Sequence, residues 1–219
     1  MDSSADTATV TGDGPQIYLA SSSPRRRELL DQIGVRYHVL PVDADERRRA
    51  GESPRDYVLR MARTKARLAA ANPGRVMDIP VLAADTVVVI DGEVLGKPTH
   101  REHAESMLAR LSGRVHEVLT AVAVMHRTEG VRVSATQVEF RPIDPVEAAA
   151  YWATGEPLDK AGAYAIQGRG AVFVARVEGS YSGVVGLPLF EVAQLLREYH
   201  IACLYESGAI GADNDRRGI

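Results

Sequence analysis

The sequence has very little cysteine and no long apolar run. Cys203 is the only cysteine among the 219 residues, so neither an intrachain disulfide nor a cluster of thiolate metal ligands can form. A single thiol suits a reducing compartment, and we expect a cytoplasmic location. No apolar stretch approaches the roughly 18 uninterrupted residues of a membrane span. The first residues are acidic and polar, whereas a signal peptide starts basic and then turns apolar.

An excess of positive charge is also missing. The formal net charge is −3 at pH 7, whereas proteins that bind nucleic acids or membrane surfaces non-specifically present a net basic face. We therefore expect neither kind of partner. Three catalytic motifs are absent as well, namely the HExxH zinc helix, the GxSxG nucleophile elbow and the GxxxxGK(S/T) phosphate loop. With 45% hydrophobic and 25% charged residues, the chain has the composition of an ordinary globular protein.

Strand and helix patterns alternate along the chain, with no internal repeat and no change of composition that would mark a linker. The apolar patterns predict strands at 17–20, 37–42, 80–90, 93–95, 115–125, 131–140 and 171–177. Helical patterns and capping signals predict helices at 24–33, 53–71, 99–112, from 144 onward and at 188–199. This order predicts one α/β domain over residues 16–204, with a disordered leader at 1–15 and a flexible tail at 205–219.

Helix-start signals are explicit at two places in this order. Thr99 with Glu102, and Asp144 with Glu147, have the spacing of a capping box, in which two side chains satisfy the first free backbone N–H groups. The long helix that precedes them carries an apolar stripe that ends at Leu68. We expect this stripe to face the core.

The most informative segment runs from Leu19 to Leu30 and reads LASSSPRRRELL. Ser23 is a good N-cap and Pro24 suits the first helical position, so a helix is expected to begin there. Its free N–H groups and the charges of Arg25 and Arg26 favour a phosphate group. A capped surface helix with solvated arginines is the alternative interpretation.

Asp85 is the anomaly in the apolar strand at 80–90. Its neighbours are alanine, threonine and valine, and a buried carboxylate costs several kcal/mol unless a cation, a metal or hydrogen bonds compensate it. Asp85 must therefore have a partner. A structural salt bridge and a role in catalysis or metal binding both meet that demand.

Three other charged residues allow two interpretations each. Lys97 follows a predicted hairpin and either presents a point charge to phosphate or is solvated in its loop. Lys65, on the long helix, is either a phosphate contact or a surface lysine whose stem covers apolar neighbours. Glu46 either binds a hard divalent cation or is a solvated loop residue.

Five separated segments, in order, resemble the Maf family of nucleoside triphosphate pyrophosphatases. They are LASSSPRRRELL, RTKAR, AADTVVVIDGEVLGKP, LSGRVHEVLTAVAV, and GEPLDKAGAYAIQGRG followed by EGSYSGVVGLPLFE. The resemblance spans residues 17–199. It implies an inosine-triphosphatase-like α/β fold, with an elongated mixed β-sheet flanked by helices and two lobes around a deep cleft. It also implies hydrolysis of nucleoside triphosphates to monophosphate and pyrophosphate with a divalent metal, Mg²⁺ or Mn²⁺.

The resemblance further implies functions for nine positions that match the family's motifs. The substrate-binding residues it implies are Ser21, Arg25, Arg26, Thr86 and Gln167, of which Arg25, Thr86 and Gln167 are tied to substrate choice. The catalytic residues it implies are Lys65, Lys97 and Asp85, with Asp85 as the proton acceptor. The metal-linked residue it implies is Glu46. The chemistry of triphosphate hydrolysis adds Asp85 as a second metal ligand, so Asp85 is either the base or a metal ligand only.

Within the family, KAGAYAIQG, GSYS and VVGLPL are similar to the branch that prefers dTTP and UTP, rather than to the branch that handles 7-methyl-GTP. The expected substrates are thus dTTP, UTP and modified pyrimidine nucleotides. The Gln167 side chain has both a donor and an acceptor, which complement the edge of uracil or thymine. Gly183 departs from this branch, which often has a larger polar residue there. Homodimerisation is expected from the resemblance alone.

Other functions stay open at this point. A nucleotide-responsive binding protein that inhibits septum formation through a protein partner is the main alternative, because the family name derives from effects on septum formation. A pyrophosphatase that controls the nucleotide pool and also affects cell division would combine the enzymatic function with this alternative. The arginines at 25–27 and 47–49 could form a basic stripe for nucleic acid, but the net acidity opposes that interpretation.

Overall fold

A computed structural model describes residues 14–204, so most of the expected leader and the whole expected tail lie outside the described residues. The strands are β1 (Ile17–Leu19), β2 (Tyr37–Val39), β3 (Val81–Ile90), β4 (Glu93–Leu95), β5 (Val115–Met125), β6 (Glu129–Phe140) and β7 (Val174–Glu178). The helices are α1 (Pro24–Gln32), α2 (Pro54–Ala70), α3 (Arg101–Leu111), α4 (Pro145–Ala153), α5 (Tyr181–Val185) and α6 (Leu189–Glu198). Two short 3₁₀ helices are η1 (Ala161–Ala163) and η2 (Arg169–Phe173).

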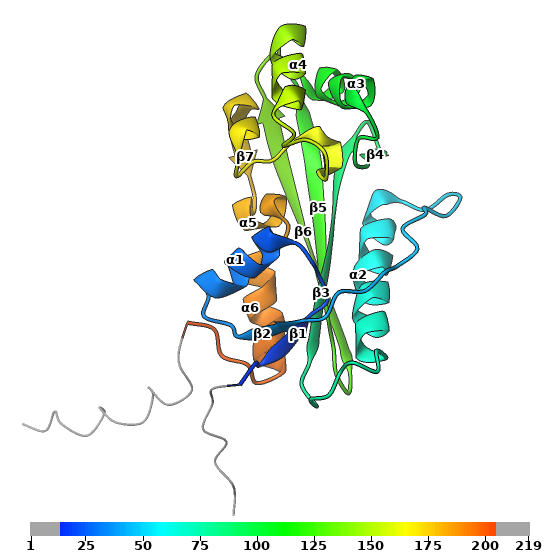
Figure 1. Ribbon diagram of the computed structural model, residues 1–219, viewed down its shortest axis with the longest axis vertical. Helices are drawn as coiled ribbons and strands as arrows, with labels where there is room; N and C mark the ends of the chain where they lie inside the picture. The colour runs from blue at the N-terminus through cyan, green and yellow to red at the C-terminus, as the bar shows by residue number, and fades with distance from the viewer. Residues whose placement is uncertain (1–13, 205–219) are drawn as a thin grey trace, which may run out of the picture.

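The strands form one seven-stranded mixed sheet with helices on its faces (Figure 1), which confirms the expected α/β class. The strand order is β2-β1-β3-β5-β6-β7, and β4 pairs with β3. β1 runs parallel to β2 and β3, whereas the other neighbours are antiparallel. The long strands β3, β5 and β6 run along the length of the molecule. Among residues 14–204, no helix is long and apolar enough to cross a membrane.

Strand β3 is central because its sequence, VLAADTVVVI, is apolar on both faces. Since side chains alternate along a strand, Ala83 and Val87 point to one face, where they pack in the cluster that contains helix α2. Ala84 and Val88 point to the other face and join the cluster that contains α1 and α6. Asp85 shares the parity of the first pair, so its side chain faces α2.

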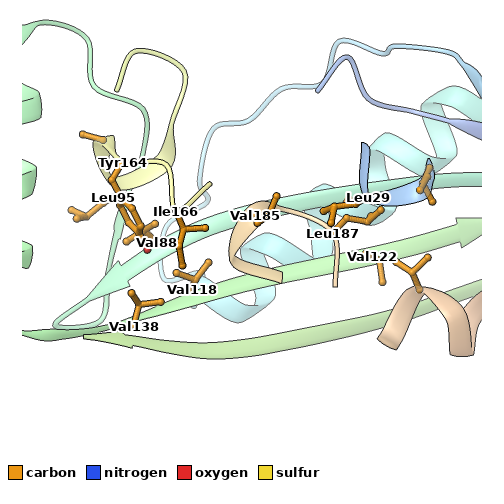
Figure 2. Packing of buried hydrophobic residues seen from close by; sticks show 14 of the residues in the cluster. Leu29, Val88, Leu95, Val118, Val122, Val138, Tyr164, Ile166, Val185 and Leu187 are labelled. Atoms are coloured by element: carbon orange, nitrogen blue, oxygen red, sulfur yellow. The ribbon is translucent and has the colours of Figure 1, made fainter. Parts of the chain in front are cut away.

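The larger of the two apolar clusters lies on the face opposite α2. Figure 2 shows Val88 and Tyr164 packed together at one end of this cluster, and Leu29 and Leu187 at the other. Burial of each such side chain stabilises the fold by about 1.5–3 kcal/mol. This packing fixes the loops that carry polar residues at the edge of β3.

The positions of the helix starts agree with the prediction better than the hydrogen bonds that cap them. α1 begins at Pro24 as expected, but the Ser23 side chain makes no capping hydrogen bond, and the Ser23 N–H donates to Ser21 Oγ at 3.2 Å. The capping box of Asp144 and Glu147 at α4 is confirmed.

The capping box expected at α3 is wrong. His100, not Thr99, is the N-cap of this helix, and its Nδ1 accepts a hydrogen bond from the His103 N–H at 3.2 Å. A histidine nitrogen can serve as the capping acceptor, so the helix begins one residue later than the Thr99 pattern indicates.

Two further differences concern packing and element boundaries. The apolar stripe of α2 does not include Leu68, which is 42% exposed. The buried face is continued by Ala62, Ala66 and Ala69 instead, because small side chains let the helix lie close to the sheet. Residues 171–173, expected at the start of a strand, belong to η2, and the strand β7 begins at 174.

Candidate active site

The site begins at an uncovered stretch on one edge of β3. β1 pairs only with Val81 and Leu82, and β4 pairs with β3 only from Val88 onward. No strand pairs with this edge of β3 between these positions in the described part of the chain. Asp85 and Thr86 lie in this stretch, and their side chains point to opposite faces of the sheet. A ligand at this edge can therefore reach both residues.

Asp85 and Glu46 share one cation, the ammonium group of Lys65. Lys65 Nζ lies 2.7 Å from Asp85 Oδ1 and 2.7 Å from Glu46 Oε1. Lys65 projects from α2, whose buried face holds the helix against the Asp85 side of β3. The partner that a buried Asp85 requires is thus Lys65, whose side chain is itself only 13% exposed.

The two carboxylates differ in their surroundings. Burial raises the pKa of Asp85, although the charge and hydrogen bond of Lys65 oppose that effect. Burial also acts on Glu46, but the hydrogen bond and charge of Lys65, together with the charge of Lys97, outweigh it and lower the Glu46 pKa. A buried carboxylate with a raised pKa is suited to accept a proton near neutral pH.

Arg26 joins three separate segments around the site. Its Nε donates to the Gly186 carbonyl at 2.8 Å, its Nη1 to Ser21 Oγ at 3.1 Å and its Nη2 to Thr86 Oγ1 at 3.4 Å. Burial lowers the pKa of Arg26, and the charge of Asp85 opposes that effect. These bonds hold the guanidinium in a fixed orientation.

Arg25, the residue before Arg26, makes fewer hydrogen bonds with the described residues. Its Nε is buried and finds no hydrogen-bond partner among residues 14–204. Burial lowers its pKa, and the charges of Asp159, Glu28 and Glu156 oppose that effect. A buried donor without a partner costs free energy unless a ligand satisfies it. Arg25 therefore has the property expected of an anion contact.

Thr86 lies in a chain of polar contacts behind Arg26. Thr120 Oγ1 is 3.0 Å from Thr86 Oγ1 and 2.7 Å from the Gly183 carbonyl. Gly183 thus contributes its backbone to this chain, whereas Val184, Val185 and Gly186 line the cavity. A Cβ at Gly183 would lie 3.1 Å from Ser180 Cβ. A larger residue at this position would therefore require Ser180 to move.

Gln167 is an exposed residue on the loop between η1 and η2, and hydrogen bonds to Glu156 and Tyr151 hold this loop in place. Glu156 accepts hydrogen bonds from Tyr151 Oη at 2.7 Å, from the Arg169 N–H at 2.9 Å and from the Gly170 N–H at 3.0 Å. The Tyr151 hydroxyl in turn accepts from the Ala165 N–H at 3.1 Å. These bonds fix the loop on both sides of Gln167.

All nine site residues expected from the sequence line one cavity of about 940 Å³. They come from five regions of the chain: Ser21, Arg25 and Arg26 around the start of α1, Glu46 before α2, Lys65 on α2, Asp85, Thr86 and Lys97 on or after β3 and β4, and Gln167 between η1 and η2. A volume of this order suits a ligand of nucleotide size.

Further polar residues that were not predicted as site residues also line this cavity, among them Tyr57, Asp159 and Lys160. Tyr57 Oη donates to the Glu46 carbonyl at 2.8 Å and so holds the loop of the acidic residue. Tyr57 is buried on the apolar face of α2, and the sequence pattern of that face gives no separate signal for its hydroxyl. Asp159 and Lys160 lie within one of the matched segments, but no local pattern distinguishes them there.

The two carboxylates fit a hard divalent cation. Glu46 and Asp85 already share a positive group, which shows that one cation can reach both. Residues 14–204 hold no group of three or more histidine, cysteine or acidic residues placed to bind a metal. Mg²⁺ commonly uses one or two carboxylates and completes its coordination with water and substrate phosphates. The donor set here matches that pattern.

Comparisons with known proteins agree on one family. The family model "Maf-like protein" matches residues 16–199. A dTTP/UTP pyrophosphatase of Alkalilimnicola ehrlichii is 56% identical over 191 residues, covering 85% of this chain and 94% of that protein. A dTTP/UTP pyrophosphatase of Nitrosomonas europaea is 52% identical over 205 residues, covering 88% of this chain and 99% of that protein.

Likeness to solved structures is partial. The Staphylococcus aureus Ham1 protein aligns with a TM-score of 0.38 at 17% identity, covering 57% of this chain and 71% of that chain. A dITP/XTP pyrophosphatase of Mycobacterium abscessus aligns with a TM-score of 0.35 at 18% identity, covering 58% and 74%.

Proposed function

Because the chain belongs to the family of Maf-like proteins, we propose that it hydrolyses nucleoside triphosphates, dTTP and UTP above all, to monophosphate and pyrophosphate. Relatives with the name dTTP/UTP pyrophosphatase match it over most of both chains. The observation that carries the proposal is the cavity, which brings the buried Asp85 and the Arg25–Arg26 pair to one place. Residues 16–204 act as one catalytic unit in this proposal.

Cleavage at the α-phosphorus requires neutralisation of about four negative charges on the triphosphate while a water molecule approaches in line. Arg25 and Lys97 line the cavity and supply positive charge to the phosphates. Arg26 is fixed by its three protein hydrogen bonds and supplies a permanent positive field beside Thr86. Because these groups are placed before the substrate binds, little reorganisation is needed when charge develops on the phosphate oxygens.

Asp85 accepts the proton of the attacking water. Its carboxylate is buried and its Oδ1 is oriented by Lys65 Nζ at 2.7 Å, which leaves Oδ2 for the water. Burial raises the Asp85 pKa and so makes the carboxylate a stronger base than an exposed aspartate.

Glu46 and Asp85 would hold Mg²⁺ or Mn²⁺, and the donor set fits such an ion. When bound there, the ion supplies Lewis-acid polarisation of the phosphate oxygens. Lys65 keeps the two carboxylates together within hydrogen-bond distance of one point.

Base selection falls to Gln167 and Thr86 in this proposal. The Gln167 amide can donate to a carbonyl oxygen of uracil or thymine and accept from the ring N–H. Cytosine has the opposite pattern at that edge and pairs only with an amide turned by 180°, so the proposal requires that the bound enzyme holds the Gln167 amide in one orientation. Polar sites of this kind reject the wrong partner more strongly than apolar pockets do.

The test is a panel of dTTP, UTP, CTP, 7-methyl-GTP and pseudouridine triphosphate with Mg²⁺ or Mn²⁺, read out as released pyrophosphate. We expect dTTP and UTP to give the highest kcat/KM and CTP to be poor. Absence of pyrophosphate from all five would reject the enzyme. Tight nucleotide binding without turnover would instead favour the binding protein that acts on septum formation through a partner.

Three further features remain predictions. A homodimer is expected from the family and is tested by light scattering of the purified protein. A cytoplasmic location follows from the single cysteine of the chain. An effect on cell division is tested by overproduction of the wild type beside an Asp85→Asn variant.

A further inference from the structure

The chain uses lysine at only three positions. Of its 26 basic residues, 23 are arginine, and lysine occurs only as Lys65, Lys97 and Lys160. All three lysines line the cavity described above. Positive side chains elsewhere in the sequence are therefore arginines and histidines.

An ammonium and a guanidinium are different ligands. Lysine offers a compact point charge with three rotatable donors, whereas arginine offers a planar fork that needs more space. In a chain that places arginine at 23 positions, the three lysines mark places where a compact cation is used. Lys65 and Lys97 already have a proposed function, and Lys160 does not.

Lys160 is placed beside the loop of Lys97. The two loops are joined by a hydrogen bond from the Gly162 N–H to the Gly96 carbonyl at 3.0 Å. Gly162 has a φ of +69°, and a Cβ there would lie 3.0 Å from the Val88 side chain. Only glycine permits this approach of η1 to β3 without strain. The contact therefore sets the distance between the two lysine-bearing loops.

The Lys160 ammonium is half-buried and forms no ion pair or hydrogen bond with any residue that the structure describes. Burial lowers its pKa, and the charges of Arg25 and Lys97 lower it further, whereas Asp159 and Glu156 raise it. The Glu156 carboxylate is already occupied by Tyr151 and two backbone N–H groups. Arg25, Lys97 and Lys160 thus lie near one another, with Asp159 as the acidic neighbour left to compensate them.

The other two cations of the cavity are already engaged. Lys65 is bound to both carboxylates, and Arg26 donates to three protein oxygens. The attacked α-phosphorus must lie near Asp85, so the rest of the triphosphate extends toward positive groups that are still free. The pyrophosphate leaving group carries most of the negative charge of the substrate.

We propose that Lys160, together with Arg25 and Lys97, forms a pyrophosphate subsite that holds the two terminal phosphates and retains them as the α–β bond breaks. This inference rests on the proposed function. In the reaction, water attacks the α-phosphorus, the bridging oxygen leaves with the bond electrons, and pyrophosphate departs as the anion that these cations bind. Lys160 precedes η1 and Gln167 follows it, so in this proposal one short segment would contact both ends of the substrate.

The lysine count makes a direct measurement possible. Full-length protein labelled with ¹³C at the lysine Cε carbon gives three side-chain signals, and Lys160→Arg removes and so assigns one of them. On titration with inorganic pyrophosphate, we expect the Lys160 and Lys97 signals to shift in a saturable way. A Lys160 signal that stays unchanged up to saturation of the Lys97 signal, or no shift in any signal, overturns the subsite.

Inhibition kinetics give the second measurement. Lys160→Met should raise the inhibition constant of pyrophosphate about tenfold or more, because one charge-assisted contact is lost, while inhibition by the nucleoside monophosphate stays as in the wild type. Lys160→Arg should recover part of the loss. The matched control is Arg176→Met, an exposed residue paired with Glu178, which should change neither constant.

Equal changes in both inhibition constants for Lys160→Met would show a general structural effect, and no change in either would show that Lys160 is not a ligand; both results overturn the inference. The proposed function fails separately, through absence of turnover by the wild type. The pyrophosphate titration needs no turnover and still decides whether the subsite exists.

Discussion

Replacement of Asp85 by asparagine separates catalysis from folding at this site. Asparagine has nearly the same shape, and its Oδ1 can still accept from Lys65 Nζ, which Asp85 Oδ1 contacts at 2.7 Å. Lys65 also keeps Glu46 at 2.7 Å, so the ammonium does not become unpaired. Removal of one partner of a buried ion pair usually destabilises a protein strongly, because the other charge is left uncompensated. Here Glu46 still compensates the Lys65 ammonium, and the loss is limited to the difference between a charged and a neutral hydrogen bond, so we expect the free energy of unfolding to fall by about 1 kcal/mol.

The effect on turnover should be far larger. Loss of a general base costs about 10²–10⁴ in rate, which corresponds to about 3–5 kcal/mol of transition-state stabilisation. At saturating Mg²⁺, nucleotide binding should stay the same or become tighter, because a negative charge near the phosphates is removed, whereas the Mg²⁺ concentration needed for activity should rise, because one proposed metal ligand is weakened. The expected pattern for Asp85→Asn is therefore a lower kcat with a KM that does not rise.

Pyrophosphate release measures kcat and KM, calorimetry measures nucleotide binding, and urea unfolding measures stability. Asp78→Asn is the matched control, since Asp78 is an exposed carboxylate paired with Arg75, and it should behave as the wild type. A kcat of Asp85→Asn within threefold of the wild type would refute the assignment of Asp85 as base. A large loss of stability would refute the claim that Lys65 tolerates the exchange.

Three other predictions concern the surroundings of the site. Gln167→Ala should reduce the ratio of kcat/KM for UTP over CTP more than it reduces kcat for UTP; equal loss for both nucleotides contradicts base recognition. Glu156→Gln should also reduce the ratio of kcat/KM for UTP over CTP, because the Glu156 carboxylate holds the loop that carries Gln167. A change in kcat with an unchanged ratio would argue against a positioning function for Glu156. Burial lowers the pKa of His116 to about 4, below its ordinary value of about 6.5, so the unfolded chain binds a proton that the folded chain does not bind between these pH values. Stability should therefore fall as pH drops from about 6.5 to 4, by up to roughly 3 kcal/mol. In urea unfolding, the stability of His116→Gln should no longer fall in this way between about pH 6.5 and 4, whereas the stability of the exposed-site control His38→Gln should fall as in the wild type. The same fall in His116→Gln would exclude His116 as its source.

The sequence was sufficient for elements whose signal is local. The strand at 80–90 was predicted within one residue of β3, because ten consecutive residues suit a strand that is buried on both faces. The capping box of Asp144 and Glu147 was also predicted, since both partners lie within one helical turn. The capping box predicted at Thr99 is wrong, because the neighbouring His100 offers a competing acceptor that caps the helix instead.

For the site, residue types were predictable and partners were not. The cost of a buried carboxylate predicts that Asp85 has a partner, but only the packing of α2 on β3 shows that the partner is Lys65. The bond from Arg26 to the Gly186 carbonyl joins residues 160 positions apart in the chain. No periodicity or spacing carries that information, because it arises from the order of strands in the sheet.

The most direct test of the central claim is a single turnover of UTP in water enriched in ¹⁸O, with the products separated and weighed by mass spectrometry. Attack on the α-phosphorus, next to Asp85 and the paired arginines, predicts one ¹⁸O atom in uridine monophosphate and none in pyrophosphate. Label in pyrophosphate, or release of uridine diphosphate with orthophosphate, would contradict this arrangement of the substrate in the cavity.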